Sequence, residues 1–220
     1  MVKFPSAPQA PDEFFEHTIP ALVEAWGGLR SVAGADFHLG VRLEGAGGGE
    51  WLYTFRAGAL SVRAGSRLKA SLTWIQSVAD WRGALWEGRG GIVAEKTVGL
   101  LRGERPGRRS RRAAAGIGDA KILSRLAKLD GVLCARVVDG PDGDWSTAFK
   151  FGPGAIPSEA TTTVSIRNDD AEALARRKMR PLEAFLAGRI RIDGSITFAL
   201  QLQALAVSAG KAGSADDEGE

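Results

Sequence analysis

Cysteine, histidine and long apolar runs are all scarce in this sequence of 220 residues. The single cysteine, Cys134, excludes an intramolecular disulfide framework and a metal site built from several cysteines. The two histidines, His17 and His38, have no G-x-S-x-G motif near them, so the pattern of a catalytic triad is missing. We therefore predict a protein with no catalytic residues, no metal site and no cofactor.

Membrane-spanning and signal segments are missing as well. No window reaches the roughly 18 consecutive apolar residues that a transmembrane helix needs, and residues 1–17 lack the hydrophobic centre of a signal peptide. The hydrophobic content of 44% and the mean hydropathy of −0.09 are ordinary for a globular protein with a sizeable core. We expect a cytoplasmic globular protein.

Positive charge is concentrated in the first part of the chain. Residues 1–118 contain 16 Lys and Arg against 11 Asp and Glu, whereas residues 119–220 contain 13 against 15. Much of the excess lies in the stretch RPGRRSRR, whose proline and glycine favour a loop. This loop is either a solvated linker or a contact with an anionic membrane surface. The predicted membrane-contact residues are Arg108, Arg109, Arg111 and Arg112.

Two stretches of the chain resemble each other. FHLGVRLEGAGGGEWLYTFRAG and VLCARVVDGPDGDWSTAFKFG each indicate a strand, a glycine-bearing turn and a second strand, so that Trp51 corresponds to Trp145 and Phe55 to Phe149. Each is preceded by an apolar helical segment and followed by strands rich in Thr, Val and Ile. Helical segments then follow, with Ser77 and Asn168 as candidate N-caps. The order helix, hairpin, strand, helix therefore occurs twice.

The two copies end differently. The second continues into GRIRIDG and the amphipathic helix SITFALQLQALAVSA, for which the first copy has no counterpart. We divide the chain into a degenerate first copy at 12–104, an arginine-rich linker at 105–118, a complete second copy at 119–207 and a disordered acidic tail at 208–220. Trp74, Trp81 and Trp86 predict a bulky core in the first copy or an interface between the copies.

The most specific pattern lies in residues 181–202. It comprises Pro181, Ala184, Phe185, Gly188, Ile190, Ile192 and Gly194. With the hairpin and the strand before it, this pattern resembles the sterol-binding domain of the sterol carrier protein 2 family. The resemblance extends over residues 119–207 and, more loosely, over 12–104. It implies an α+β fold, in which helices pack on one face of a mostly antiparallel sheet, and an apolar tunnel for sterols, fatty acids or acyl-CoA.

Burial arguments favour the same kind of site, because a small sheet covered by amphipathic helices forms a pocket where their apolar stripes are incompletely buried. We predict that the second copy holds the ligand and the first acts as structural cover. The candidate ligand-binding residues are Phe149, Val164, Ile166, Leu174, Phe185, Phe198 and Leu202.

Three functions remain open from the sequence. The leading one is non-enzymatic binding of an apolar lipid, with or without its transfer. The alternative is an accessory module that presents a lipid or isoprenoid to a partner enzyme, or a scaffold with a filled core. A nucleic-acid partner is not expected, since the arginine loop lacks the interleaved aromatic residues on which bases stack.

Overall fold

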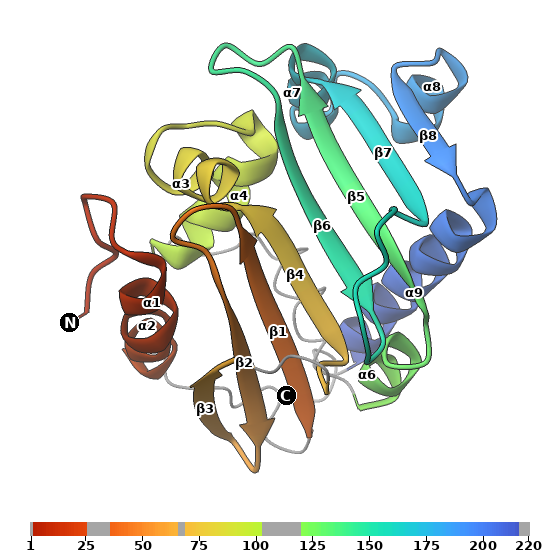
Figure 1. The fold of residues 1–220 in the computed structure, drawn as a ribbon. Coiled ribbons are helices and arrows are strands. Elements are labelled where there is room, and N and C mark those ends of the chain that lie inside the picture. Colours follow the sequence, from red (N-terminus) through yellow and green to blue (C-terminus); the bar gives the residue numbers. More distant parts are fainter. Residues whose placement is uncertain (1, 26–35, 66–68, 103–119, 216–220) are drawn as a thin grey trace.

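A single mixed sheet runs through both halves of the chain (Figure 1). The computed structural model describes residues 2–25, 36–65, 69–102 and 120–215, and in these the strand order is β3-β2-β1-β4-β6-β5-β7-β8. The pairs β1–β4 and β5–β7 are parallel, and the other neighbouring strands are antiparallel. The predicted α+β class with a mostly antiparallel sheet is thus confirmed.

The first half of the sheet is built on a glycine-rich hairpin. Its strands are β1 (Phe37–Glu44), β2 (Gly49–Arg56), β3 (Ala59–Ala64) and β4 (Leu72–Ser77). The β1–β2 turn needs glycine because Gly45 and Gly47 have φ angles of 101° and 75°, which side chains with a Cβ atom rarely adopt. The predicted hairpin is therefore present.

The second half repeats this pairing. Its strands are β5 (Gly131–Val138), β6 (Trp145–Phe151), β7 (Thr162–Arg167) and β8 (Ile190–Gly194). Trp145 lies opposite Val137 in the β5–β6 hairpin, as Trp51 lies opposite Val41 in the β1–β2 hairpin. Each hairpin also has a parallel strand beside its first strand, β4 in one half and β7 in the other.

The two halves meet where β4 pairs with β6. Four antiparallel residue pairs form this joint, from Leu72 opposite Phe151 to Ile75 opposite Ala148. β6 thus occupies the edge of β4 where the first half has no further strand of its own. Both predicted copies contribute to one continuous sheet.

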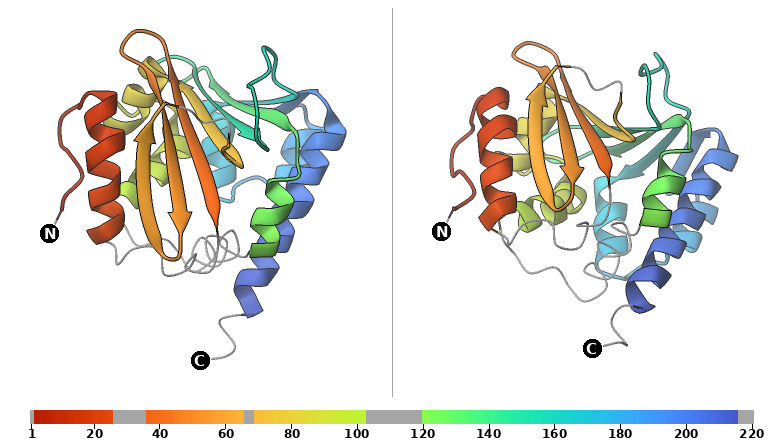
Figure 2. Two further views of the ribbon diagram at one scale, coloured as in Figure 1. Left: turned by 60° about the horizontal axis from the view of Figure 1, so that its bottom comes forward. Right: turned by 90° about the horizontal axis from the view of Figure 1, so that it is seen from below.

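Helices cover one face of this sheet (Figure 2). The first half contributes α1 (Pro11–Glu13), the π-helical turn η1 (Phe14–Thr18), α2 (Ile19–Ala25), α3 (Val78–Trp86) and α4 (Gly91–Leu101). The second half contributes α6 (Ala120–Leu126), α7 (Asn168–Ala175), α8 (Pro181–Leu186) and α9 (Ile196–Ala215). The sequence did not lead us to expect α4.

Helix boundaries follow local chemistry at some ends only. Ser77 caps α3 as predicted, since its Oγ accepts a hydrogen bond of 2.9 Å from the backbone N–H of Asp80. The N-cap prediction for Asn168 is wrong: the cap position of α7 is Arg167, and Asn168 is the first helical residue. α9 reaches Ala215, so it extends eight residues past the predicted end of the second copy at 207.

Alternation along the strands separates an apolar inner face from a polar outer face. Val41, Trp51 and Tyr53 point toward the helices, where they form a buried core with Phe14 and Trp81. Aromatic rings dominate this core; Phe15, for example, stacks on Trp51 with the ring centroids 4.7 Å apart. The predicted bulky core of the first copy is confirmed.

Candidate functional site

An apolar cavity of about 480 Å³ lies between the inner face of the sheet and the helices of the first half. This size is within the range of small-molecule sites, roughly 300–1,000 Å³. Strand residues form its floor: Leu39, Val41, Tyr53, Phe55, Leu60, Leu72, Trp74, Gln76, Trp145, Thr147 and Phe149. Helix residues form its roof: Phe14, Phe15, Ile19, Val23, Trp81, Ala84, Leu85, Ala94, Val98 and Leu101. The lining is suited to a hydrocarbon.

The floor of the cavity crosses the joint between the halves. Trp74 of β4 and Phe149 of β6 lie opposite each other in the antiparallel register, and both line the cavity. The indole Nε1 of Trp74 donates a 2.8 Å hydrogen bond to Thr147 Oγ1 in β6. The joint between the halves therefore also forms part of the cavity wall.

Most polar groups around the cavity are already paired. Gln76 Nε2 donates to the carbonyl oxygen of Ser146 at 2.9 Å, and the Tyr53 hydroxyl donates to the carbonyl oxygen of Phe15. Trp81 differs, because its side chain is fully buried and its Nε1–H has no hydrogen-bond partner among the described residues. An unpaired buried donor costs about 1–3 kcal/mol. A ligand oxygen that accepted this hydrogen would remove the cost.

A second hollow of about 440 Å³ adjoins the apolar cavity. The two share Ala84, Leu85 and Val98 in their walls. This second hollow has charged side chains of both signs: Glu95 and Glu172, together with Arg102, Arg176 and Arg89, whose buried Nε has no partner in the described part of the chain. An apolar compartment thus borders a polar one, the arrangement that an amphipathic ligand requires.

Tyr53 lies on the cavity floor and is the chain's one tyrosine. Burial raises the pKa of its phenol far above the ordinary value, and the nearby Glu16 carboxylate raises it further. The unfolded chain releases this proton near pH 10, whereas the folded protein retains it. The free energy of unfolding contributed by Tyr53 is therefore present below about pH 10 and decreases above it.

We expect no tyrosinate absorbance from the folded protein at pH values where a free phenol is ionised. The signal should appear together with loss of the circular dichroism spectrum, because unfolding exposes Tyr53. Tyr53→Phe should decline less in stability over the same alkaline range. A gradual titration near pH 10 with an unchanged dichroism spectrum would contradict the buried position.

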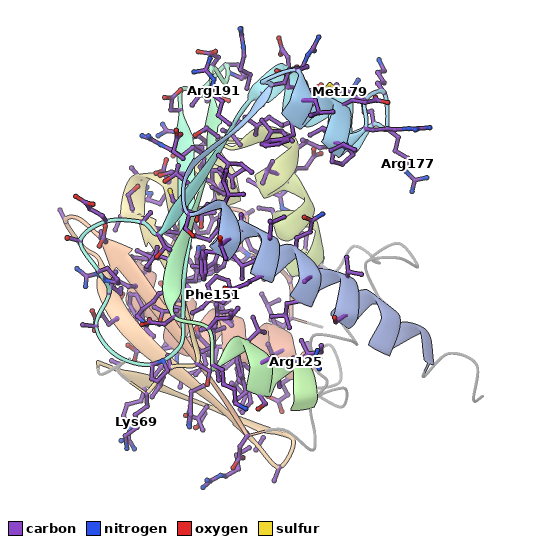
Figure 3. All side chains as sticks on the ribbon, turned by 90° about the vertical axis from the view of Figure 1, so that its right-hand side faces the viewer. Lys69, Arg125, Phe151, Arg177, Met179 and Arg191 are labelled. Carbon is purple, nitrogen blue, oxygen red and sulfur yellow. The ribbon has the colours of Figure 1, made fainter. Side chains whose placement is uncertain are left out.

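The predicted ligand-binding residues lie in several places. Phe149 lines the cavity. Val164 and Ile166 lie in β7, on the inner face according to the register. Phe198 of α9 is buried, edge-on to Phe151 at 5.8 Å between ring centroids (Figure 3 labels Phe151). Leu174 and Leu202 are half-buried, and Phe185 is 41% exposed on α8. Apart from Phe149, none of them lines the cavity described above, and their role stays a prediction.

The predicted membrane-contact arginines, Arg108, Arg109, Arg111 and Arg112, and the linker that carries them, lie outside the described residues. Among the described residues, no helix is long and apolar enough to cross a bilayer.

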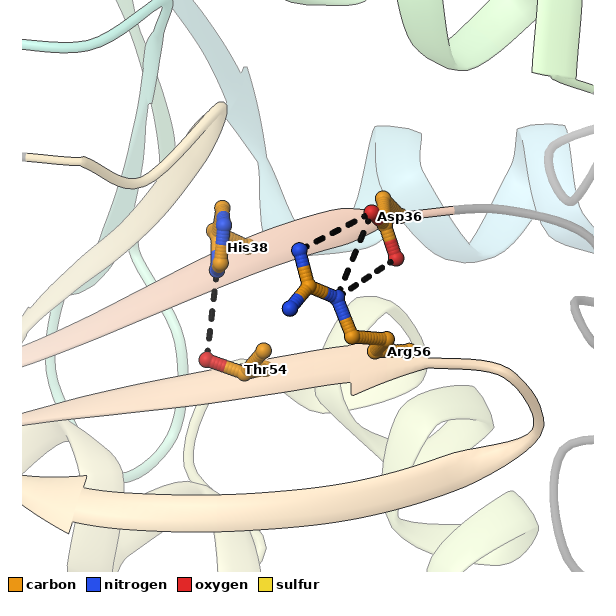
Figure 4. A network of polar contacts seen from close by, with 4 residues as sticks. All are labelled: Asp36, His38, Thr54 and Arg56. Carbon is orange, nitrogen blue, oxygen red and sulfur yellow. Dashed lines mark hydrogen bonds and ion pairs between the residues drawn. The ribbon is translucent and has the colours of Figure 1, made fainter.

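The outer face of the sheet carries polar pairs. His38 Nδ1 lies 3.2 Å from Thr54 Oγ1, and Arg56 donates to both carboxylate oxygens of Asp36 (Figure 4). Both are cross-strand or edge contacts, and neither contains a Cys or Ser nucleophile. Within the described ranges, no cluster of three His, Cys, Asp or Glu residues could hold a metal ion.

The single cysteine is not an activated nucleophile. Burial raises the pKa of the Cys134 thiol, and this effect is larger than the opposite effects of Arg136 and Thr163, which lower it.

Sequence reasoning missed the cavity in the first half. The residues that form the roof come from η1, α2, α3 and α4, and the last of these helices was not predicted. The density of tryptophan around Trp74 and Trp81 was the available signal. It pointed correctly to a bulky core, but it could not distinguish a filled core from a lined cavity.

Comparison with known proteins identifies a family for part of the chain. Residues 113–207 match the SCP-2 sterol transfer family, which confirms the resemblance over that stretch. Sterol carrier protein 2 of Oryctolagus cuniculus is 35% identical over 94 residues, which are 40% of this chain and 17% of the relative, and that of Homo sapiens is 33% identical over the same shares. The chain thus spans about a sixth of these curated relatives.

Solved structures include similar domains. The sterol carrier protein domain 2 of Helicoverpa armigera is 20% identical, with a TM-score of 0.32, and the match covers 53% of this chain and 89% of that one. Sterol carrier protein 2 from Yarrowia lipolytica is 13% identical, with a TM-score of 0.30, and covers 45% and 87%.

Proposed function

We propose, from the match of residues 113–207 to the SCP-2 sterol transfer family, that this chain binds an apolar lipid and carries it without catalysing a reaction. The observation that carries the proposal is the apolar cavity of about 480 Å³. Transfer of a hydrocarbon from water to such a cavity is favourable by roughly 25 cal/mol per Å² of buried apolar surface. Binding therefore needs no chemistry.

The two adjoining hollows support an amphipathic ligand with one apolar and one polar part. An alkyl chain or sterol ring system would occupy the apolar cavity, and one polar end would meet the unpaired Nε1–H of Trp81 or the arginines Arg89 and Arg102. Fatty acids, sterols and acyl-CoA all have this form. A hydrocarbon without oxygen would leave the buried donor unsatisfied and should bind less tightly.

Some of the ligand-binding residues predicted from the sequence line the cavity or lie on the same face of the sheet. Phe149 is common to the cavity and to the predicted set, while Val164 and Ile166 continue the same inner face of the sheet into the second half. A ligand longer than the cavity would extend along them. We also retain the proposal that the arginine-rich linker contacts an anionic membrane, where lipid would be taken up or released.

The proposal predicts saturable binding. A fluorescent fatty acid or sterol analogue should bind with a Kd in the micromolar range or below and be displaced by unlabelled lipid. Because Trp74 and Trp81 line the cavity, the bound probe should quench tryptophan fluorescence in proportion to occupancy. An alkane with the chain length of the fatty acid is the matched competitor and should displace the probe less well. Absence of saturable binding across sterols, fatty acids and acyl-CoA would refute the function.

The alternative of an accessory module uses the same cavity. In that case the lipid is presented to an enzyme rather than exchanged between membranes. Native mass spectrometry of the purified protein would detect the bound lipid under both functions, and a co-purifying enzyme would favour the accessory module.

A further inference from the structure

Helix α8 carries its apolar side chains on the outside of the protein. Leu182, Phe185 and Leu186 are 67%, 41% and 76% exposed, whereas Ala184 is completely buried. The spacing of the exposed residues places them on one side of the helix. A helix of a globular domain usually turns such a stripe toward the core. The stripe on α8 has no covering partner among the described residues.

Basic residues flank this stripe on both sides in the sequence. Between residues 176 and 191 the chain has six exposed basic residues and one acidic residue, Glu183. The basic residues are Arg176, Arg177, Lys178, Arg180, Arg189 and Arg191. Figure 3 labels Arg177 and Arg191, which lie at the end of the molecule that carries α8.

Some of these cations are already paired. Arg176 contacts Glu172 at 3.0 Å, Arg180 contacts Glu183 at 3.9 Å and Arg189 contacts Asp170 at 2.9 Å. Arg191 lines a surface pocket together with Asp169 and Asp193. Arg177 and Lys178 have no ion-pair partner in the part of the chain that the structure describes. Their charge is the least compensated on this surface.

From this arrangement we infer that α8 and the loop before it form a docking surface for an anionic lipid bilayer. Leu182, Phe185 and Leu186 would enter the boundary between headgroups and acyl chains, and Arg177 and Lys178 would contact the phosphates. Amphipathic helices with basic flanks bind membrane interfaces in this way. The long basic side chains can place their stems along the apolar surface while their charges stay at headgroup level.

The charge of the α8 surface favours an anionic bilayer over a second copy of the chain as its binding partner. In a two-fold symmetric dimer the same patch would face itself, so the unpaired cations of both copies would lie near one another. Such an arrangement is repulsive, whereas an anionic bilayer is attractive. The docking surface does not depend on the cavity and does not require that the chain bind lipid internally.

The test is co-sedimentation of the full chain with vesicles. We expect binding to vesicles that contain phosphatidylserine, weak binding to pure phosphatidylcholine, and release as salt rises. The double variants Leu182→Ser/Leu186→Ser and Arg177→Gln/Lys178→Gln should each lower the vesicle partition coefficient by about fivefold or more, since the first removes apolar side chains that enter the interface and the second removes two charges that contact the phosphates. All four side chains are exposed, so folding should be unaffected.

Matched controls use exposed residues elsewhere. Arg125→Gln/Lys128→Gln on and after α6, and Leu200→Ser/Val207→Ser on α9, should bind vesicles like the parent protein. If all four double variants partition equally, or if the α8 variants change only self-association in analytical ultracentrifugation, the docking surface is refuted. If the α8 variants still bind the fluorescent lipid, their loss of vesicle binding is not caused by damage to the cavity.

Discussion

Val98→Trp is expected to weaken lipid binding by about tenfold or more, a loss of ~1.4 kcal/mol or greater. Val98 is buried on α4 and faces the sheet across the cavity. An indole at this position would occupy space that the ligand needs. Because the cavity offers that space, the strain in the free protein should stay within the usual 1–3 kcal/mol for an enlarged core side chain. The probe titration described above measures the loss.

Val93→Trp is the matched control on the same helix. Val93 is 39% exposed and does not line the cavity, so the same substitution should leave both affinity and fold unchanged.

Phe198→Ala tests whether the second half of the chain contributes to ligand binding. It removes a buried ring from α9 and should cost about 3–5 kcal/mol of stability, yet the folded fraction should bind the probe normally. If Phe198→Ala abolished binding in a folded protein while Val98→Trp did not, the ligand would lie in the second half, as the sequence suggested.

Lys150→Met is expected to lower the free energy of unfolding by about 2–4 kcal/mol. Lys150 is 2% exposed near the C-terminal end of β6, and its Nζ donates to the carbonyl oxygens of Phe151, Gly152 and Pro153 at 2.9–3.0 Å. Asp130 lies 3.6 Å away and supplies the opposite charge. Methionine fills a similar volume but leaves three carbonyl groups without this donor. Urea denaturation followed by circular dichroism measures the difference.

Lys128→Met provides the comparison for Lys150. Lys128 is exposed after α6, so the same substitution should change stability by less than about 0.5 kcal/mol. Equal stability of both variants would mean that the three carbonyl groups find water or other donors when the ammonium is removed, and that Lys150 does not hold the end of β6.

Local patterns in the sequence were sufficient to predict the strands. Glycines such as Gly45 and Gly47 indicate turns because of the φ angles they permit, and alternating Thr, Val and Ile indicate strands. Ser77 was recognisable as a cap because its partner, the N–H of Asp80, is three residues away. Asn168 is also a residue type that is common at N-caps, but it is the first residue inside the helix rather than the cap. Residue type alone does not reveal this difference.

The cavity could not be predicted in the same way, because it depends on contacts between residues far apart in the chain. Trp74 and Phe149 became neighbours through the β4–β6 pairing, which no local pattern indicates. The cavity is a space that η1, α2, α3 and α4 leave above the sheet, and its volume follows from their packing. The outward stripe of α8 was missed for a related reason: its spacing predicts an amphipathic helix but not the direction in which it faces.

The β4–β6 joint also determines what would happen to the halves in isolation. A chain cut between residues 103 and 119 would leave β4 in one fragment and β6 in the other, each with an open backbone edge and an aromatic face directed at water. Such edges promote intermolecular strand pairing. Each fragment alone should therefore aggregate, whereas co-expressed fragments should associate through these edges and reconstitute the cavity floor. The protein is in this sense a natural candidate for a split-protein reporter, in which lipid binding returns only when both pieces meet.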